Sequence, residues 1–332
     1  MTRCCAMLLA ASLLFDGQAA SAQQSAPGAE CGRATTPLDR AACADPGLAV
    51  ANTSMSFAFQ GLKAQLPADQ QAALVQDQQA WTEARAASCG DNAGAALFRC
   101  LLAETQARER MLSGGGRNRD RNAPRLQPVF FREARKDRYD IEVAYPEIAH
   151  ARSPGETAFN KTAHDAILGD VGLMSQYRNA EGAGLSTHVV FYDIHYLGPR
   201  LATIVFWLVS RSRAWAHPFT AREALAFDLA LGRPLHPDDV IEAPAQAVAP
   251  IAALCRRRLE KDAAEQGWRL LANANPAAAV ANFQNWAPGP FALDILFDPG
   301  VVAAEAAGPH ECRLDYPLLA LNIKLKAPLP PR

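Results

Sequence analysis

The chain has 332 residues and a mass of 35.7 kDa, which is more than one hydrophobic core usually serves, so two folded units are expected. Its 49% hydrophobic residues and mean hydropathy of −0.09 exclude wholesale disorder and a polytopic membrane protein. A net charge of −1 provides no basic field for phosphate groups, which argues against a nucleic-acid-binding protein.

The first 22 residues have the order of a secretory signal peptide. Arg3 supplies a positive start, residues 6–15 an apolar stretch, and residues 20–22 (Ala-Ser-Ala) a small-residue cleavage site. Neither cysteine of this segment has the position of a lipoprotein cysteine, and no later segment reaches about 18 consecutive apolar residues. We therefore expect a periplasmic or secreted protein without a transmembrane anchor.

Six cysteines follow the signal peptide. They are Cys31, Cys43, Cys89 and Cys100 in a first group and Cys255 and Cys312 in a second. In an oxidising compartment, even numbers predict disulfides within each group and none between the groups. Cys255 would then pair with Cys312, whereas three pairings stay open for the first four cysteines. Six buried free thiols are the alternative.

Residues 113–128, between the two cysteine groups, are predicted to be a flexible basic linker. The stretch begins Ser-Gly-Gly-Gly and continues with alternating charges and no apolar periodicity. Residues 113–138 carry a net charge of +5, against −2 for residues 23–112 and −4 for residues 139–332. Such a stretch could contact an anionic surface, although charge runs are more often simply solvated.

Residues 23–112 are predicted to form a small helical domain. Apolar residues recur at helical spacing within 48–66, 74–81 and 97–111, and Pro67 separates the first two helices. Three short helices bury a modest core, so disulfides worth about 2–4 kcal/mol each are expected to stabilise it.

Residues 30–113 resemble the N-terminal domain of the LprI-type lysozyme inhibitors. The resemblance rests on the four cysteines, on Asp77-Gln78-Gln79-Ala80-Trp81 with Arg85, and on Cys100-Leu101 before Arg108 and Leu112. The family commonly has Asp at the position of Asn52 and Tyr at the positions of Phe59 and Thr105. The resemblance implies a protein that binds lysozyme or a related muramidase and obstructs its substrate cleft without catalysis.

Trp81 and Arg85 are candidate partner-binding residues of this domain. Trp81 could be an aromatic hot spot, although its spacing of seven residues from Leu74 favours a position in the core. Arg85 follows one helical turn later and suits a salt bridge as well as a ligand contact.

Residues 129–328 show the alternating pattern of β-strands. Strands are predicted at 139–146, 188–196, 201–209, 223–231, 291–297 and 314–323, and helices at 157–174 and 248–266. Strands joined by short turns, with helices packed to one side, predict an α+β domain with a mainly antiparallel sheet.

Residues 139–325 resemble an envelope domain shared by the lysozyme-sensing anti-sigma factor RsiV and the accessory region of a peptidoglycan deacetylase. The motifs are Ile141-x-Val143-x-Tyr145-Pro146, Ala216-His217-Pro218, Phe227-Asp228-Leu229, Asp238-Asp239-Val240 and Phe291 to Phe297. The family usually has two glycines where Ala214 and Trp215 stand. Trp215 and His217 are the candidate partner-binding residues of this half.

The sequence predicts no catalytic residue, no metal site and no cofactor. His188 and His195 would lie on opposite faces of one strand, and no His-x-x-x-His or paired Cys-x-x-Cys is present. A nucleophile elbow, a Walker motif and a dinucleotide-binding glycine pattern are also absent.

The sequence therefore favours an exported, non-enzymatic lysozyme inhibitor. The main alternative is an envelope sensor or a module that binds peptidoglycan or another glycan without inhibiting lysozyme. A hydrolase that uses the second domain is a third possibility.

Overall fold

Three helices form the N-terminal part of the computed structural model, which describes residues 40, 43–90, 94–115, 122–179, 185–215, 217–319, 324 and 327–329. They are α2 (Pro46–Lys63), α3 (Ala68–Cys89) and α4 (Gly94–Ser113), and they confirm the predicted helical character of this segment. The Asp45 side chain accepts the Leu48 N–H at 2.8 Å, which caps the start of α2. The predicted signal peptide and Cys31 lie outside the described residues.

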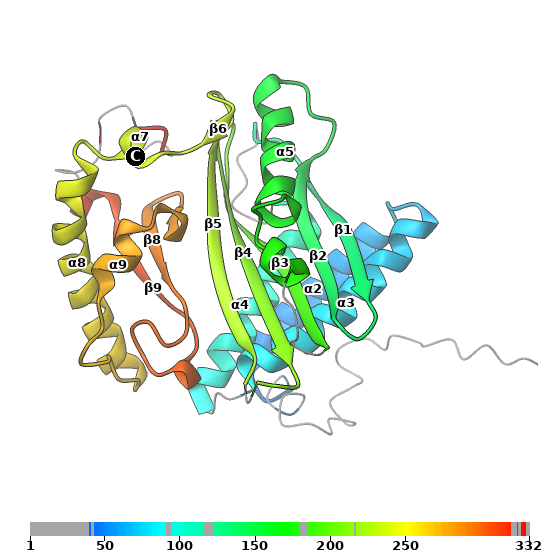
Figure 1. The fold of residues 1–332 in the computed structure, drawn as a ribbon, viewed down its shortest axis with the longest axis horizontal. Coiled ribbons are helices and arrows are strands. Elements are labelled where there is room, and N and C mark those ends of the chain that lie inside the picture. The colour runs from blue at the N-terminus through cyan, green and yellow to red at the C-terminus, as the bar shows by residue number, and fades with distance from the viewer. Residues whose placement is uncertain are drawn as a thin grey trace, which may run out of the picture.

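A curled sheet of six strands follows, in the order β1-β2-β3-β4-β5-β6 (Figure 1). The strands are β1 (Leu126–Arg135), β2 (Tyr139–Ile148), β3 (Ser186–Leu197), β4 (Leu201–Ser212), β5 (Phe219–Asp228) and β6 (Arg233–Pro234). The β2–β3 pair is parallel and the other pairs are antiparallel. A parallel pair requires a crossover, and α5 (Pro154–Leu168) and α6 (Ser175–Asn179) provide it. The predicted mainly antiparallel sheet is thus confirmed.

Helices cover both faces of this sheet. On one face, Trp81 of α3 packs with Val189 and Phe191 of β3. On the other face, Phe159 of α5 meets Phe227 of β5 edge to face, with ring centroids 5.5 Å apart. Figure 1 shows α5 in front of the sheet and α2 to α4 behind it.

The N-terminal helices share a hydrophobic core with the sheet. Phe59, Leu62, Leu74 and Met111 belong to the same buried cluster as Ile141 and other residues of β2 to β5. Part of the predicted linker contributes too, because Ala123 and Leu126 are buried in this cluster. A bidentate pair between Arg110 of α4 and Asp193 of β3, at 2.6 and 2.7 Å, adds a polar contact.

A second sheet of three antiparallel strands packs beside the first. Its strands are β7 (Trp286–Pro288), β8 (Ala292–Phe297) and β9 (His310–Asp315). The helices around it are α7 (Pro237–Val240), α8 (Pro244–Gln266), α9 (Pro276–Ala281) and the short 3-10 turns η2 (Phe283–Asn285), η3 (Glu305–Ala307) and η4 (Tyr316–Leu319). A disulfide joins Cys255 of α8 to Cys312 of β9, the pair that the cysteine distribution predicts.

Several details differ from the predicted elements, and β5, for example, covers Phe219–Asp228 rather than 223–231. The last strand covers residues 310–315 rather than 314–323, because Pro317 has no N–H for a ladder and residues 316–319 form a 3-10 turn. Strand β1 was not predicted, since it starts within the segment assigned to the linker. The helix predicted at 157–174 covers Pro154–Leu168 and ends before Gly169.

Candidate functional site

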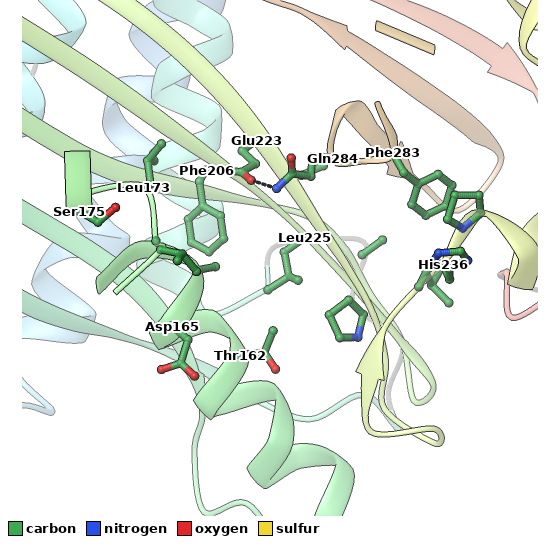
Figure 2. Close-up of a pocket in the computed structure, with 18 of the residues that line it drawn as sticks. Thr162, Asp165, Leu173, Ser175, Phe206, Glu223, Leu225, His236, Phe283 and Gln284 are labelled. Carbon is green, nitrogen blue, oxygen red and sulfur yellow. Dashed lines mark hydrogen bonds between the residues drawn. The ribbon is translucent and has the colours of Figure 1, made fainter. Parts of the chain in front are cut away.

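A cavity of about 930 Å³, here called the trough, opens between α5, β5 and the turn η2. Figure 2 shows Thr162 and Asp165 on one side, His236 and Phe283 on the other, and Leu225 between them. The remaining polar lining comes from Ser175, Gln176, Glu223 and Gln284. Gln284 donates a hydrogen bond to Glu223, whose pKa is raised chiefly by burial. A mixed lining of this kind is typical of small-molecule sites, which commonly measure about 300–1,000 Å³.

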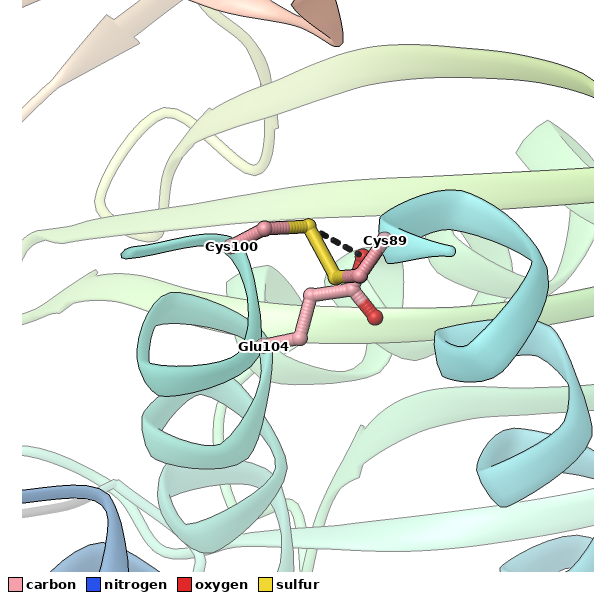
Figure 3. A group of neighbouring side chains, drawn as sticks. All are labelled: Cys89, Cys100 and Glu104. Atoms are coloured by element: carbon pink, nitrogen blue, oxygen red, sulfur yellow. Dashed lines mark hydrogen bonds between the residues drawn. A yellow bond between two sulfur atoms is a disulfide. The ribbon is translucent and has the colours of Figure 1, made fainter. Parts of the chain in front are cut away.

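The N-terminal helices are held by the Cys89–Cys100 disulfide, which joins the end of α3 to the first turns of α4. Glu104 lies beside this bond, with Oε1 4.0 Å from the Cys100 sulfur (Figure 3). Burial raises the pKa of Glu104 to about 8, and the charge of Arg85 opposes this rise. Cys43 is also disulfide-bonded.

Cys89, Cys100 and Glu104 are the one grouping of potential metal ligands within the described ranges. Both sulfurs are already joined in the disulfide, so neither is available as a thiolate ligand. His188, for which the sequence predicted no role in a metal site, is buried between Ser186 and Ser210 at 2.8 Å from each hydroxyl. Burial lowers its pKa to about 4, so the ring is neutral at pH 7.

Buried polar contacts join α3 to α4. Arg108, whose side chain is fully buried, forms an ion pair with Asp77 at 2.6 Å from Oδ2, and its Nε donates a hydrogen bond to Gln78 Oε1 at 2.9 Å. Burial raises the pKa of Asp77, and the Arg108 charge opposes this effect. These residues of the LprI-like signature therefore maintain the packing of the helices.

Trp81 lies in the interior and is only 1% exposed. Its ring packs against β3, and the guanidinium groups of Arg85 and Arg108 lie 4.6 and 5.4 Å from its centre. A partner cannot reach this indole in the folded protein, so the core position favoured by its spacing is the one observed.

Arg85 is half-buried and works as a connector between helices. It donates to Thr105 Oγ1 at 2.8 Å and to Asn52 Oδ1 at 3.4 Å. Asn52 and Thr105 are two of the positions where the chain departs from the common residues of the LprI-type family. Both substituted residues are thus hydrogen-bonding partners of the signature arginine.

The two most exposed large apolar residues in the described part of the helical segment lie on α2. Phe57 is 73% exposed and Val50 is 63% exposed, and their spacing of seven residues places them on one side of the helix. Sequence reasoning missed this surface, which we call the α2 surface. The available signal was that both residues fall outside the periodic stripe from Leu48 to Leu66.

Trp215 and His217 both lie in the turn between β4 and β5, whereas Trp81 and Arg85 lie on α3. Both are exposed, and Phe219 beside them is 46% exposed. This turn is a second accessible aromatic surface.

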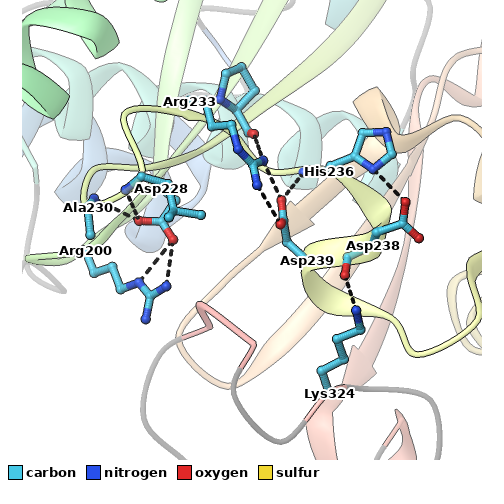
Figure 4. Close-up of polar contacts among 10 residues, drawn as sticks. Arg200, Asp228, Ala230, Arg233, His236, Asp238, Asp239 and Lys324 are labelled. Atoms are coloured by element: carbon cyan, nitrogen blue, oxygen red, sulfur yellow. Dashed lines mark hydrogen bonds and ion pairs between the residues drawn. The ribbon is translucent and has the colours of Figure 1, made fainter.

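Charged residues of the motif from Phe227 to Val240 form local ion pairs (Figure 4). Asp228 is fully buried, pairs with Arg200 at 2.9 Å and accepts the Ala230 N–H at 2.8 Å. Arg233 makes two bonds of 2.7 Å to Asp239, which hold the pKa of that carboxyl at about 2. The motif thus fixes the turn that carries β6 and α7.

Comparison with known proteins gives a family match for the helical segment. Residues 30–112 match the family described as "Lysozyme inhibitor LprI". No curated protein matches the chain. Within the ranges that the structure describes, no helix has the length and hydropathy to cross a membrane.

Two solved structures of the DUF3298 family are similar to the chain. The structure from Bacteroides fragilis NCTC 9343 has a TM-score of 0.48 and 14% sequence identity. The aligned region covers 61% of this chain and 95% of the Bacteroides chain. The structure from Pseudomonas aeruginosa PAO1 has a TM-score of 0.45 and 15% sequence identity. The aligned region covers 63% of this chain and 98% of the Pseudomonas chain. Similarity at this level assigns no function to the chain, and the RsiV-like character of the second half stays a prediction. The similarity that bears on function is that of residues 30–112 to a family of lysozyme inhibitors.

Proposed function

We propose that the protein binds a lysozyme or a related muramidase and inhibits it, without catalysis of its own. The match of residues 30–112 to the LprI lysozyme inhibitors is the observation that carries the proposal. The proposal includes export directed by residues 1–22. It also includes the division that the sequence predicts, with a helical segment at 23–112, a linker at 113–128 whose last residues form the start of β1, and an envelope domain at 129–328.

The α2 surface is the proposed contact within the helical segment. Asp77, Trp81 and Arg108 are buried, so they act on a partner only by fixing the shape of the helices. Phe57 and Val50 are accessible, and Lys63 is the one charged side chain of α2. An aromatic residue on a surface with few charges is typical of the centre of a protein interface.

Obstruction of the substrate cleft is the proposed mechanism. A lysozyme cleaves its glycan between two carboxyl groups that line an open cleft. A helix that inserts Phe57 into this cleft would exclude the glycan, and no proton transfer by the inhibitor is required. The Cys89–Cys100 bond and the Asp77–Arg108 pair support the proposal, because a rigid surface loses little conformational entropy on binding.

The test is the lysis of a bacterial cell-wall suspension by lysozyme, followed by turbidity, with and without the full-length oxidised protein. Phe57→Ala should raise the inhibition constant about tenfold, as expected for an aromatic residue at the centre of an interface. Phe291→Ala is the matched control, because Phe291 is also 73% exposed but lies in the turn between β7 and β8.

Unchanged turbidity loss at a large excess of the protein would refute inhibition. Equal inhibition by wild type and Phe57→Ala, with a loss in Trp215→Ala, would instead move the contact to the β4–β5 turn with Trp215 and His217.

A second candidate function is binding to peptidoglycan, as an envelope sensor or glycan-binding module. The trough favours it, because this cavity lies outside the helical segment that matches the inhibitors. Sedimentation with purified cell walls in the absence of inhibition would support this candidate over the first.

A further inference from the structure

The trough lacks the chemistry of an anion site. Its lining includes the carboxyl groups of Asp165 and Glu223 and contains no Lys or Arg among the described residues. An anionic ligand would therefore be repelled and left without a charged partner. The hydroxyl and amide groups of Thr162, Ser175 and Gln176 suit a neutral ligand that both donates and accepts hydrogen bonds.

Strand β5 presents free backbone groups to this trough. Its inner edge pairs with β4, and two contacts show which residues point to the outer edge. The Arg222 N–H donates to Asp298 Oδ1 at 2.8 Å, and the Ala226 C=O accepts the Leu235 N–H at 2.8 Å. Residues two apart in a strand point the same way, so the N–H and C=O of Ala224 also face outward.

Ala224 is 7% exposed, and among the described residues nothing bonds to its outward N–H or C=O. The Ala224 side chain packs with Val205 and Ala287, on the face of the sheet opposite the trough. Because Ala224 nevertheless lines the trough, its backbone is the part that faces the cavity. Buried backbone groups are nearly always paired, and an unpaired set beside a cavity points to a ligand that pairs with them.

The free part of this edge is short. Asp298 occupies the N–H of Arg222 on one side, and Leu235 occupies the C=O of Ala226 on the other. Between these two contacts, the complete N–H and C=O pair is open only at Ala224 among the described residues, whereas an added peptide strand would need such pairs at several alternate residues. One amide group in the ligand satisfies this pair, because its N–H donates to the Ala224 C=O and its C=O accepts from the Ala224 N–H.

We infer that the trough binds a neutral saccharide that carries an acetamido group, such as an N-acetylhexosamine chain. The acetamido group pairs with the Ala224 backbone, and ligand hydroxyl groups donate to Glu223 and accept from Gln284. The apolar faces of the sugar rings contact Leu173 and Phe283, which are half-buried walls of the trough. The inference rests on the trough and is independent of lysozyme inhibition.

Calorimetric titration of the full chain with chitotriose, the β-1,4 trimer of N-acetylglucosamine, tests this site. Cellotriose is the matched ligand, because it has the same backbone linkage without acetamido groups. Chitotriose should bind at least about tenfold more tightly than cellotriose, since the loss of two hydrogen bonds that leaves buried groups unpaired costs about 1–3 kcal/mol. Equal affinities, or no binding of chitotriose at millimolar concentration, would overturn the inference.

Two variants locate the binding. Leu173→Trp fills the trough from its wall and should abolish chitotriose binding, whereas Leu231→Trp adds the same ring at a residue that is 52% exposed and outside the trough lining. Ala224→Pro removes the outward N–H at a sheet edge and should weaken chitotriose to the level of cellotriose. Circular dichroism verifies that each variant is folded.

Undiminished chitotriose binding by folded Leu173→Trp would overturn the assignment to the trough. Inhibition of lysozyme by Leu173→Trp should match that of the wild type, so a failure of this inference and a failure of the proposed inhibition give different results.

Discussion

Replacing Arg108 with leucine tests whether a buried ion pair maintains the N-terminal helices. The side chain of Arg108 is fully buried and that of Asp77 is 6% exposed, with 2.6 Å between Nη2 and Oδ2. Arg108→Leu leaves the Asp77 carboxylate buried without its cation and removes the bond to Gln78. We expect the free energy of unfolding to fall by about 3–5 kcal/mol, the usual cost of breaking a buried pair from one side.

The assay is guanidinium unfolding of the oxidised full chain, followed by circular dichroism at 222 nm, for wild type, Arg108→Leu, Asp77→Leu and the double variant. The double variant should be more stable than Arg108→Leu, because it removes the stranded charge, and a coupling energy of about 2 kcal/mol is expected. Destabilisation by Arg108→Leu should also be smaller at pH 5 than at pH 8, since burial favours the protonated form of Asp77. The reasoning would be refuted if the losses of unfolding free energy in Arg108→Leu and Asp77→Leu add up to the loss in the double variant and do not depend on pH.

Two further predictions concern the disulfide and the carboxyl group beside it. Replacing Cys89 and Cys100, which are 11 residues apart, with serine should lower the free energy of unfolding by about 2–3 kcal/mol in denaturant titrations, and an unchanged midpoint would contradict this. Because burial raises the pKa of Glu104 from 4.5 to about 8, wild-type stability should fall as the pH rises from 4.5 to 8. Glu104→Gln should therefore gain stability relative to wild type over this interval, whereas parallel pH curves would show that the carboxyl group is not buried in solution.

Local patterns were sufficient for most individual elements. The helical spacing within 48–66 predicted α2, and the alternation after Tyr139 predicted β2. Strand β1 was missed because Leu126 to Phe131 has apolar residues at both odd and even positions, so no single face stands out. Such a strand is recognised only from its pairing with β2.

The arrangement of these elements could not be predicted from periodicity. The spacing of Trp81 from Leu74 indicated a buried face, but its partner Val189 lies more than a hundred residues away in the sequence. The trough likewise is lined by α5, β5 and η2, which are far apart in the sequence. The free N–H and C=O of Ala224 are backbone groups, so the pattern of side chains does not reveal them. Contacts and cavities of this kind arise from tertiary packing, on which a single sequence carries no local signal.

The shared core leads to a prediction about the helical segment on its own. In the full chain, Trp81 and Met111 are buried against the sheet, and Arg110 pairs with Asp193. A fragment of residues 23–112 would expose these apolar side chains to water, at a cost of about 1.5–3 kcal/mol for each large one. We expect the oxidised fragment to unfold at a lower guanidinium concentration than the helices of the full chain, and to bind the dye ANS. Its inhibition of lysozyme should be weaker than that of the full chain, because a less rigid α2 surface loses more entropy on binding. A fragment that matches the full chain in stability and inhibition would show that residues 23–112 are an independent domain, as their composition and linker predict, and that their packing on the sheet contributes nothing to inhibition.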